Sequence, residues 1–264
     1  MSRWLILAAI PAGIYLLVSL LAWAMQDRLI YPASQERFEP GPGYREVTLD
    51  TSDGLALRAF ARTADAGKPT LVYFHGNGGT LAGNMAANEA FAQAGYGLLL
   101  VDYRGYGSNP GAPSEQGFYR DGRAAMGWLA GQGIAPGDTI IAANSIGGGT
   151  AVQMASEYRV RALVLVAPFT SLPDRASEIA SWLPVRWLLR DDFDNAAKLP
   201  KLGMPILIQH GTADKVVPFA HGETLSKLNP QVTFERFDGM GHELAFQPLS
   251  QQARLAWVEA LAGQ

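Results

Sequence analysis

The spacing of apolar and polar residues divides the chain into an apolar stretch, a polar link and a long region of short apolar runs. From Trp4 to Met25 no residue carries a charge, and residues 26–43 are polar and punctuated by proline and glycine. Beyond them, short apolar runs alternate with segments in which apolar residues recur every three or four positions. This alternation of strand and helix patterns predicts an α/β domain over residues 44–264.

The strand patterns predict a mostly parallel sheet. Residues 44–51 and 55–63 are joined by Ser-Asp-Gly, which is typical of an antiparallel hairpin. Later runs such as 163–167 and 206–210 are almost continuously apolar, as in strands that are covered on both faces. We therefore expect a doubly wound, eight-stranded, mostly parallel sheet with helices on both faces and right-handed crossovers. The expected strands are 44–51, 55–63, 70–74, 97–102, 139–143, 161–166, 205–209 and 232–237, and the expected helices are 81–94, 114–130, 146–158, 219–228 and 250–261.

Residues 168–202 interrupt this rhythm. They contain Trp182, Trp187, several prolines and an acidic cluster, and we interpret them as a short cap inserted over the carboxyl ends of the strands. Trp182 and Trp187, with the leucines beside them, are candidates for an acyl-binding pocket. The alternative is that they only pack against the sheet.

The N-terminal apolar stretch predicts a transmembrane anchor over residues 1–25, followed by a linker over residues 26–43. About 20 apolar residues cross the hydrocarbon of a bilayer as a helix, and tryptophans near both ends suit the membrane interfaces. Arg3 before the stretch favours a cytoplasmic N-terminus and an exported catalytic domain. A cleaved signal peptide is the alternative, since Ala22-Trp23-Ala24 fits a cleavage site, and the domain would then be secreted.

Composition removes several other classes of function. The formal net charge of −3 supplies no basic field for nucleic acid. The chain has no cysteine, which excludes disulfides, thiolate metal sites and a cysteine nucleophile.

Ser145 is the candidate nucleophile. The run Ala143-Asn144-Ser145-Ile146-Gly147 follows an expected strand and precedes an expected helix, as in the G-x-S-x-G turn that exposes a serine above a sheet. Alanine stands where that signature has its first glycine. By itself, a glycine-rich turn between strand and helix could also bind a phosphate.

The order of the acidic and histidine residues favours a hydrolase, which needs an acid after a later strand and a histidine after the last one. His242 follows the last expected strand and is the candidate general base. Asp214 follows the strand 205–209 and is the candidate acid, with Asp238 as the alternative. His221 lies in an expected helix, and we interpret it as a packing or surface residue.

The loop Phe74-His75-Gly76-Asn77-Gly78-Gly79 completes the constellation. Its backbone amides, that of Asn77 above all, are expected to form an oxyanion hole with the amide of Ile146. His75 has no second ligand at a metal spacing, so we expect it to organise this loop. Neither a metal ion nor an organic cofactor is expected.

With these motifs assembled, residues 44–264 resemble the α/β-hydrolase superfamily. They are most similar to its membrane-anchored "α/β-hydrolase domain" branch, which includes bud-emergence and depalmitoylase-like serine hydrolases. The resemblance rests on FHGNGG at 74–79, VDYRGYGSNPGAPSEQGFYRD at 101–121, NSIGGGTA at 144–151, APFTSLPD at 167–174, HGTADKVVPF at 210–219 and GMGHE at 239–243. It implies a serine hydrolase with Ser145, Asp214 and His242 as the triad, and Ala143 is a departure from its usual glycine.

The expected function is therefore hydrolysis of carboxylic esters. An apolar cap beside a membrane anchor favours lipid esters or acyl-thioesters as substrates. A peptidase and a non-catalytic binding protein of the same fold are the alternatives.

Overall fold

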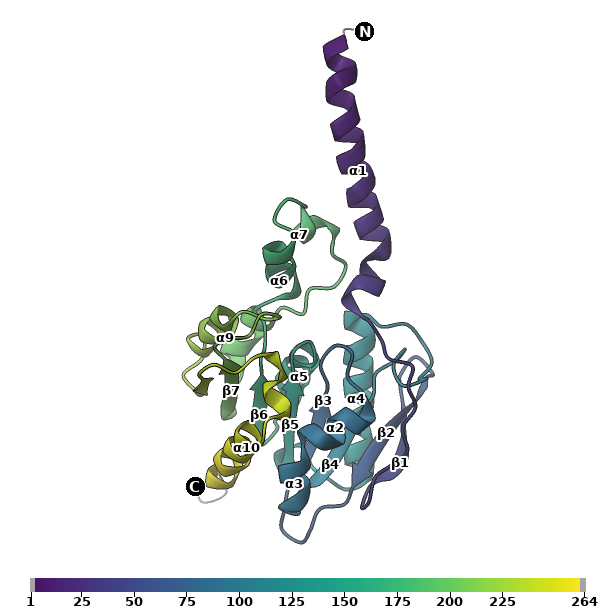
Figure 1. Ribbon diagram of the computed structural model, residues 1–264. Coiled ribbons are helices and arrows are strands. Elements are labelled where there is room, and N and C mark those ends of the chain that lie inside the picture. Colours follow the sequence, from purple (N-terminus) through teal and green to yellow (C-terminus); the bar gives the residue numbers. More distant parts are fainter. Residues whose placement is uncertain (1–2, 262–264) are drawn as a thin grey trace.

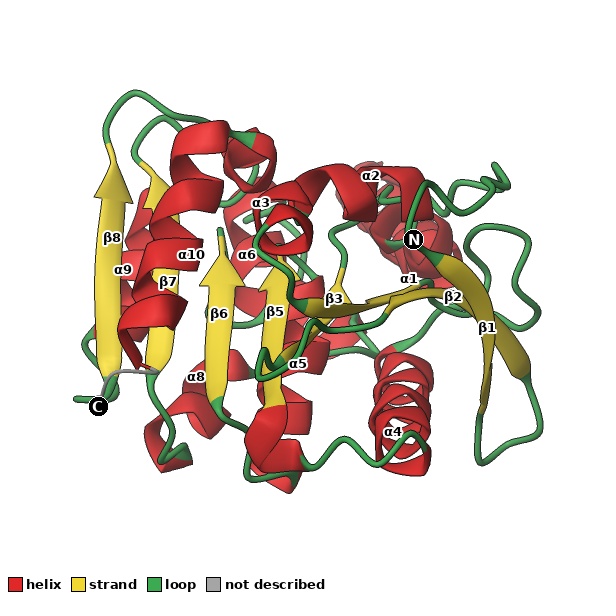
Figure 2. Cartoon of the chain, turned by 90° about the horizontal axis from the view of Figure 1, so that it is seen from below, coloured by secondary structure: helices red, strands yellow, loops and turns green. Residues whose placement is uncertain are grey.

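A long N-terminal helix rises from a domain built on one sheet (Figure 1). The computed structural model describes the backbone of residues 3–261 and the side chains of residues 10–261. Figure 2 shows the domain from below, with the sheet between two layers of helices.

The sheet has eight strands in the order β1-β2-β4-β3-β5-β6-β7-β8. The pairs β1–β2 and β2–β4 are antiparallel and the other neighbours are parallel, which confirms the predicted mostly parallel sheet. The strands are β1 (Arg45–Asp50), β2 (Ala56–Arg62), β3 (Thr70–Phe74), β4 (Gly97–Val101), β5 (Thr139–Asn144), β6 (Ala162–Val166), β7 (Ile206–Gly211) and β8 (Val232–Phe237).

Two hydrophobic layers cover the sheet, as predicted. On one face α4 and α5 pack against it through Phe118, Met126 and Val152. On the other face α2, α3 and α10 do so through Leu81, Phe91 and Val258. The domain helices are α2 (Leu81–Ala87), α3 (Glu89–Gln93), α4 (Glu115–Gly131), α5 (Gly147–Glu157), α6 (Leu172–Ile179), α7 (Val185–Leu188), α8 (Asn195–Lys198), α9 (Phe219–Ser226) and α10 (Pro248–Leu261).

The helix expected over 81–94 is two helices, because the chain bends at Asn88. This residue ends α2 with φ −121°. Its buried side-chain amide donates a hydrogen bond of 2.9 Å to the carbonyl of Asn84. Asparagine competes with the helical backbone for carbonyl groups, which explains the break.

The strand order reverses between β3 and β5, which are neighbours in the sheet. The chain leaves β3 toward β4 on one side and returns to β5 on the other. In open α/β sheets such a switch point leaves a crevice at the carboxyl ends of the strands, where ligands bind. Any loop that follows β3 or β5 therefore lies at this crevice.

Helix α1 (Arg3–Ile30) is longer than the predicted anchor, because the helix continues past Met25 for five residues. Its part from Ile10 to Ile30 is long and apolar enough to cross a membrane, and suits either an anchor or a signal sequence. In Figure 1 it extends beyond the carboxyl ends of the strands, on the side where α6 and α7 lie.

Candidate active site

The predicted triad residues all follow carboxyl ends of strands. Ser145 directly follows β5, Asp214 follows β7, and His242 begins a 3₁₀ helix (His242–Phe246) after β8. The loop with Asn77 follows β3, the neighbour of β5. The residues thus share one edge of the sheet, at its switch point.

Ser145 occupies a sharp turn between β5 and α5. Its φ of 52° lies in the left-handed region, which is costly for a residue with a Cβ and is characteristic of functional sites. Its backbone amide donates a hydrogen bond of 2.9 Å to the carbonyl of Val166 on β6. The turn forms with Ala143 fully buried in β5, so alanine in place of the usual glycine is accommodated.

Gly147 lets α5 approach the end of β3. A Cβ at Gly147 would lie 2.2 Å from the carbonyl oxygen of Phe74 and 2.6 Å from that of His75. A Cβ on Gly76 would lie 3.3 Å from the Cβ of Ser145. The loop after β3 therefore packs directly against Ser145.

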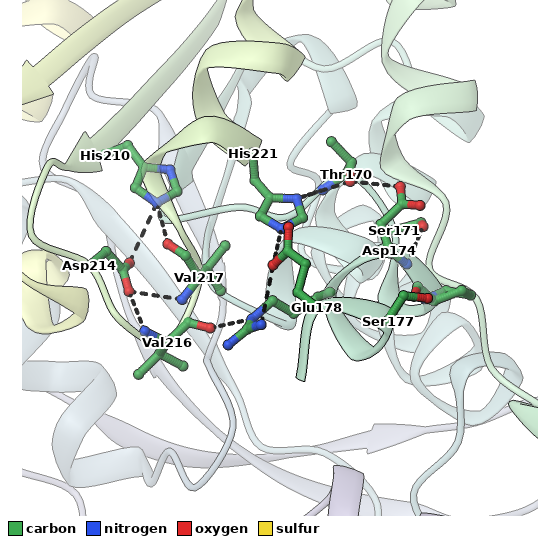
Figure 3. Close-up of polar contacts among 12 residues, drawn as sticks. Thr170, Ser171, Asp174, Ser177, Glu178, His210, Asp214, Val216, Val217 and His221 are labelled. Carbon is green, nitrogen blue, oxygen red and sulfur yellow. Dashed lines mark hydrogen bonds and ion pairs between the residues drawn. The ribbon is translucent and has the colours of Figure 1, made fainter. Parts of the chain in front are cut away.

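Asp214 and His242 form a hydrogen-bonded pair. His242 Nδ1 lies 2.8 Å from Asp214 Oδ2. The other carboxylate oxygen accepts hydrogen bonds of 2.8 Å from the amides of Val216 and Val217. His210 Nε2 lies 3.5 Å from Asp214 Oδ2 (Figure 3).

These donors keep Asp214 ionised. Burial by itself raises the pKa of Asp214, but hydrogen bonds from His210, His242 and the Val217 amide outweigh it and hold that pKa well below its usual range. A carboxylate bonded to Nδ1 requires that this nitrogen carry the proton, which leaves Nε2 of a neutral His242 as an acceptor. Among the described residues, neither Ser145 Oγ nor His242 Nε2 takes part in a hydrogen bond.

The rival acid, Asp238, is exposed and pairs with Arg236 at 2.6 Å. The structure brings Asp214, and not Asp238, to His242. The side chain of Asp214 is fully buried, whereas that of His242 is 15% exposed and lines a small cavity with Asn144 and Gly76.

Asn77 and Ile146 lie on the two loops that meet at Ser145. Neither backbone amide donates to another group within the described part of the chain. The Asn77 side chain is fixed from both ends, because Tyr106 donates 2.8 Å to its oxygen and its own Nδ2 donates to the carbonyl of Ile30. The loop is thus held while its amide stays free.

His75 lies buried beneath the same loop. Its Nε2 is 3.1 Å from the buried carboxylate of Asp102, and its Nδ1 is 2.8 Å from the carbonyl of Gly76. Gly79 packs against the imidazole so closely that a Cβ there would lie 2.5 Å from Nδ1. Within residues 10–261, no group of three or more His, Asp or Glu side chains is arranged as metal ligands.

The cap covers part of this edge through α6 and α7, which lie within the expected range 168–202. Its two tryptophans are not brought to the cavity beside His242. Trp182 and Trp187 are both largely exposed. Neither lines that cavity.

The base of the cap is tied to the loop of the acid, which Figure 3 shows. Arg175 of α6 donates to the carbonyl of Val216, whose amide binds Asp214. His221 is buried, with Nδ1 3.0 Å from the Thr170 hydroxyl and Nε2 3.2 Å from Glu178. His221 is therefore a packing residue that joins α9 to the cap.

Sequence reasoning missed the contacts between α1 and the domain. Gln26, just after the uncharged stretch, is 4% exposed, and Tyr15 and Gln26 both bind backbone groups of the cap. The polar groups of Tyr15 and Gln26 on an otherwise apolar helix could have indicated a contact. Their partners, however, lie more than 160 residues away along the chain.

Known proteins similar to this chain share its fold. A family model described as the alpha/beta hydrolase fold matches residues 69–198. The uncharacterised protein Rv2307c of Mycobacterium tuberculosis (strain ATCC 25618 / H37Rv) is 37% identical over 229 residues, which cover 83% of this chain and 79% of that protein. Alpha/beta hydrolase domain-containing protein 17B of Homo sapiens is 35% identical over 181 residues, 66% of this chain and 60% of that protein.

Solved structures of similar fold include an esterase, Pf2001, from Pyrococcus furiosus. It has a TM-score of 0.66 and 16% identity, and the match covers 87% of this chain and 96% of that one. A puromycin-hydrolyzing peptidase of Mycobacterium tuberculosis has a TM-score of 0.69 and 19% identity, over 85% of this chain and 40% of that one. The chain belongs to the α/β-hydrolase superfamily.

Proposed function

We propose that the protein is a serine hydrolase that cleaves carboxylic esters through an acyl-enzyme on Ser145. The observation that carries the proposal is the left-handed serine, with φ 52°, on the same sheet edge as a histidine bonded at 2.8 Å to a buried carboxylate. A nucleophile, a base and a group that orients the base are the three parts that such chemistry needs.

In the first step Ser145 Oγ attacks the acyl carbonyl while Nε2 of His242 takes the hydroxyl proton. Asp214 fixes the tautomer of His242 and stabilises the imidazolium that forms. The amides of Asn77 and Ile146 donate to the oxygen on which negative charge develops. Each such donor contributes on the order of 10²–10³ in rate.

His242 then returns this proton to the departing alcohol as the ester bond breaks, which completes the formation of the acyl-enzyme. In the second half of the reaction water, deprotonated by the same imidazole, attacks the acyl carbonyl, and His242 returns that proton to Ser145 Oγ as the acid leaves. Every proton passes through His242, between Ser145, water and the leaving alcohol, so the cycle uses only groups of this chain, the substrate and water.

We place lipid esters and acyl-thioesters among the preferred substrates. The cavity beside His242 has a volume of about 180 Å³. That is smaller than the ~300–1,000 Å³ of a site that encloses a whole drug-sized ligand. A cavity of this size holds only a short part of such a substrate, so most of a long acyl chain would lie outside it.

A fluorophosphonate probe tests the nucleophile, because it reacts only with an activated serine. The wild-type chain should be labelled, and Ser145→Ala should lose the label while it keeps its fold. Ser156→Ala, which removes an exposed hydroxyl on α5, is the matched control and should keep the label. Failure of the wild type to label would refute the proposal.

A substrate series separates the esterase from the peptidase. p-Nitrophenyl esters of increasing chain length, the matching thioesters and aminoacyl amides should be compared at equal concentration. We expect turnover of esters and thioesters, with a kcat/KM that rises with chain length. Preference for the aminoacyl amides would favour a peptidase instead.

We also propose that α1 is retained as a single-pass anchor, with its N-terminus in the cytoplasm and the catalytic domain outside. Hydrogen bonds from Tyr15 and Gln26 to the cap support retention, because cleavage after Ala24 would remove the first of them. A reporter that is active only outside the cytoplasm, fused after Gln264, should be active. A chain found free of the membrane after cleavage would contradict the anchor.

A further inference from the structure

The tip of the cap, residues 179–189, exposes large apolar side chains. Ile179 is 70% exposed, Trp182 60% and Trp187 90%. A tryptophan that stays in water leaves on the order of 150–250 Å² of surface unburied. Apolar exposure concentrated in one short segment marks a surface that meets something other than water.

This tip lies against α1, the helix that can cross a membrane. The Tyr15 hydroxyl donates 3.2 Å to the carbonyl of Trp182, and the two rings are 6.5 Å apart. Figure 1 shows α7 and α1 extending to the same side, beyond the sheet.

Polar side chains of α1 pair with backbone groups of the tip and its edge. Gln26 donates 3.1 Å to the carbonyl of Leu188 and accepts 2.9 Å from the amide of Arg190. A backbone group without a hydrogen-bond partner is strongly unfavourable in hydrocarbon, so such pairing is what an inserted segment requires. The contact with Tyr15 serves the carbonyl of Trp182 in the same way.

Charged residues lie where the tip and α1 meet the rest of the domain. Arg190 pairs with Asp27 at 3.2 Å and lies over the ring of Trp23 at 4.5 Å. Tryptophan and arginine are typical of a membrane–water interface. The tip itself contains one charged residue, Arg186, which pairs with Asp174 of α6.

The spacing along α1 gives the depth of Trp182 below the membrane–water interface. Tyr15 precedes Trp23 by eight residues, about 12 Å along a helix axis. If Trp23 and Arg190 mark the interface, Trp182 lies about 12 Å inside it. That is within one leaflet of a hydrocarbon core about 30 Å thick.

We infer that residues 179–189 insert beside α1 into the leaflet nearest the catalytic domain, so that the partner of this surface is the lipid bilayer. Insertion does not depend on catalysis. One consequence rests on the proposed function: since Asn77, on the loop beside Ser145, is bonded to Ile30 at the base of α1, the site lies close to that leaflet, and its acyl substrates enter from the membrane.

The absence of cysteine makes the test direct. Ser181→Cys places a single label in the tip and keeps both tryptophans, and Ala130→Cys, exposed at the end of α4, is the matched control. The full chain, as its Ser145→Ala variant, is reconstituted in nanodiscs of phosphatidylcholine and phosphatidylglycerol, with an environment-sensitive fluorophore on the cysteine.

The label at 181 should shift to shorter wavelength and lose emission to lipids that carry a nitroxide on the acyl chain. The label at 130 should respond only to aqueous iodide. Adding Trp182→Ser and Trp187→Ser should reduce the quenching at 181 by lipid. An iodide-quenched, lipid-insensitive label at 181 would overturn the inference.

Nanodiscs that hold one copy of the chain distinguish a lipid partner from a second copy. Lipid quenching at 181 should persist in single-copy discs. If the label is shielded only in discs that hold two copies, the tip is a dimer interface and the inference is wrong. Because Ser145→Ala is inactive under the proposed function, these readouts are independent of whether esterase activity is found.

Discussion

The side-chain amide of Asn77 donates a hydrogen bond to the carbonyl of Ile30, the last residue of α1. The same side chain accepts 2.8 Å from the Tyr106 hydroxyl. Asn77 therefore connects the helix that can cross a membrane with the loop whose free amide lies beside Ser145. The N-terminal helix is thus attached to the candidate catalytic centre as well as to the cap.

Asn77→Ala should lower kcat with little change in KM. The variant keeps the backbone amide but loses both side-chain hydrogen bonds that position it. We expect a loss of about 10–100-fold, up to the effect of deleting an oxyanion donor. Tyr106→Phe removes only one of the two bonds and should cost less. Equal kcat in Asn77→Ala and wild type would show that the two side-chain hydrogen bonds are not needed to position the amide.

Gly147→Ala should unfold the region around the nucleophile. Its Cβ would meet two backbone carbonyls at 2.2 and 2.6 Å, and backbone cannot move aside as a flexible side chain can. We expect a destabilisation of about 3 kcal/mol or more. Gly148→Ala is the matched control, because its Cβ would find its nearest neighbour at 3.8 Å. The measurement is the Tm of each variant. Similar Tm values for Gly147→Ala and Gly148→Ala would show that a Cβ at position 147 does not clash.

Ser145→Gly should be more stable than Ser145→Ala, although both remove the hydroxyl. The left-handed φ of 52° strains any residue with a Cβ and does not strain glycine. The expected difference is about 1 kcal/mol, near the lower end of the cost of that conformation. Tm measured at neutral pH checks it. If Ser145→Ala is as stable as Ser145→Gly, the turn at residue 145 carries no backbone strain.

Acid should destabilise the wild type more steeply than Asp214→Asn. The pKa of Asp214 in the folded chain lies below that of an unfolded aspartate, about 3.9. The unfolded chain therefore binds more protons, and the stability that Asp214 contributes is complete above about pH 5 and is lost below it. Tm should be compared between about pH 6 and about pH 3. Parallel curves for the two chains would show that Asp214 is not held in its ionised form.

Much of this fold could be predicted because its signals are local. Continuous apolar runs indicated the strands, and the turn around Ser145 follows from one strand, one helix and the glycine between them. Asp214 and His242 were found from their order along the chain, which in a parallel sheet fixes the edge where they lie. The break at Asn88 was missed, because a single side chain there overrides an apolar pattern that continues through it.

The arrangement of α1 and the cap could not be predicted in this way. Trp182 and Trp187 were expected to line a pocket, yet both are largely exposed, and Trp182 contacts Tyr15. A tryptophan pattern alone does not distinguish a side chain that faces a pocket from one that faces a bilayer. The decisive contacts join residues more than 160 positions apart, and no local period encodes them.

The bond from Arg175 to the carbonyl of Val216 has a mechanical consequence. The amide of Val216 in turn donates to the carboxylate of Asp214, the candidate acid, so under our inference a cap that moves with the leaflet would displace that carboxylate. We expect the enzyme to sense bilayer thickness, with turnover of a water-soluble ester changing between short-chain and long-chain lipids. Arg175→Ala should remove that dependence, and a wild-type rate that is the same in both bilayers would show that the linkage transmits no force.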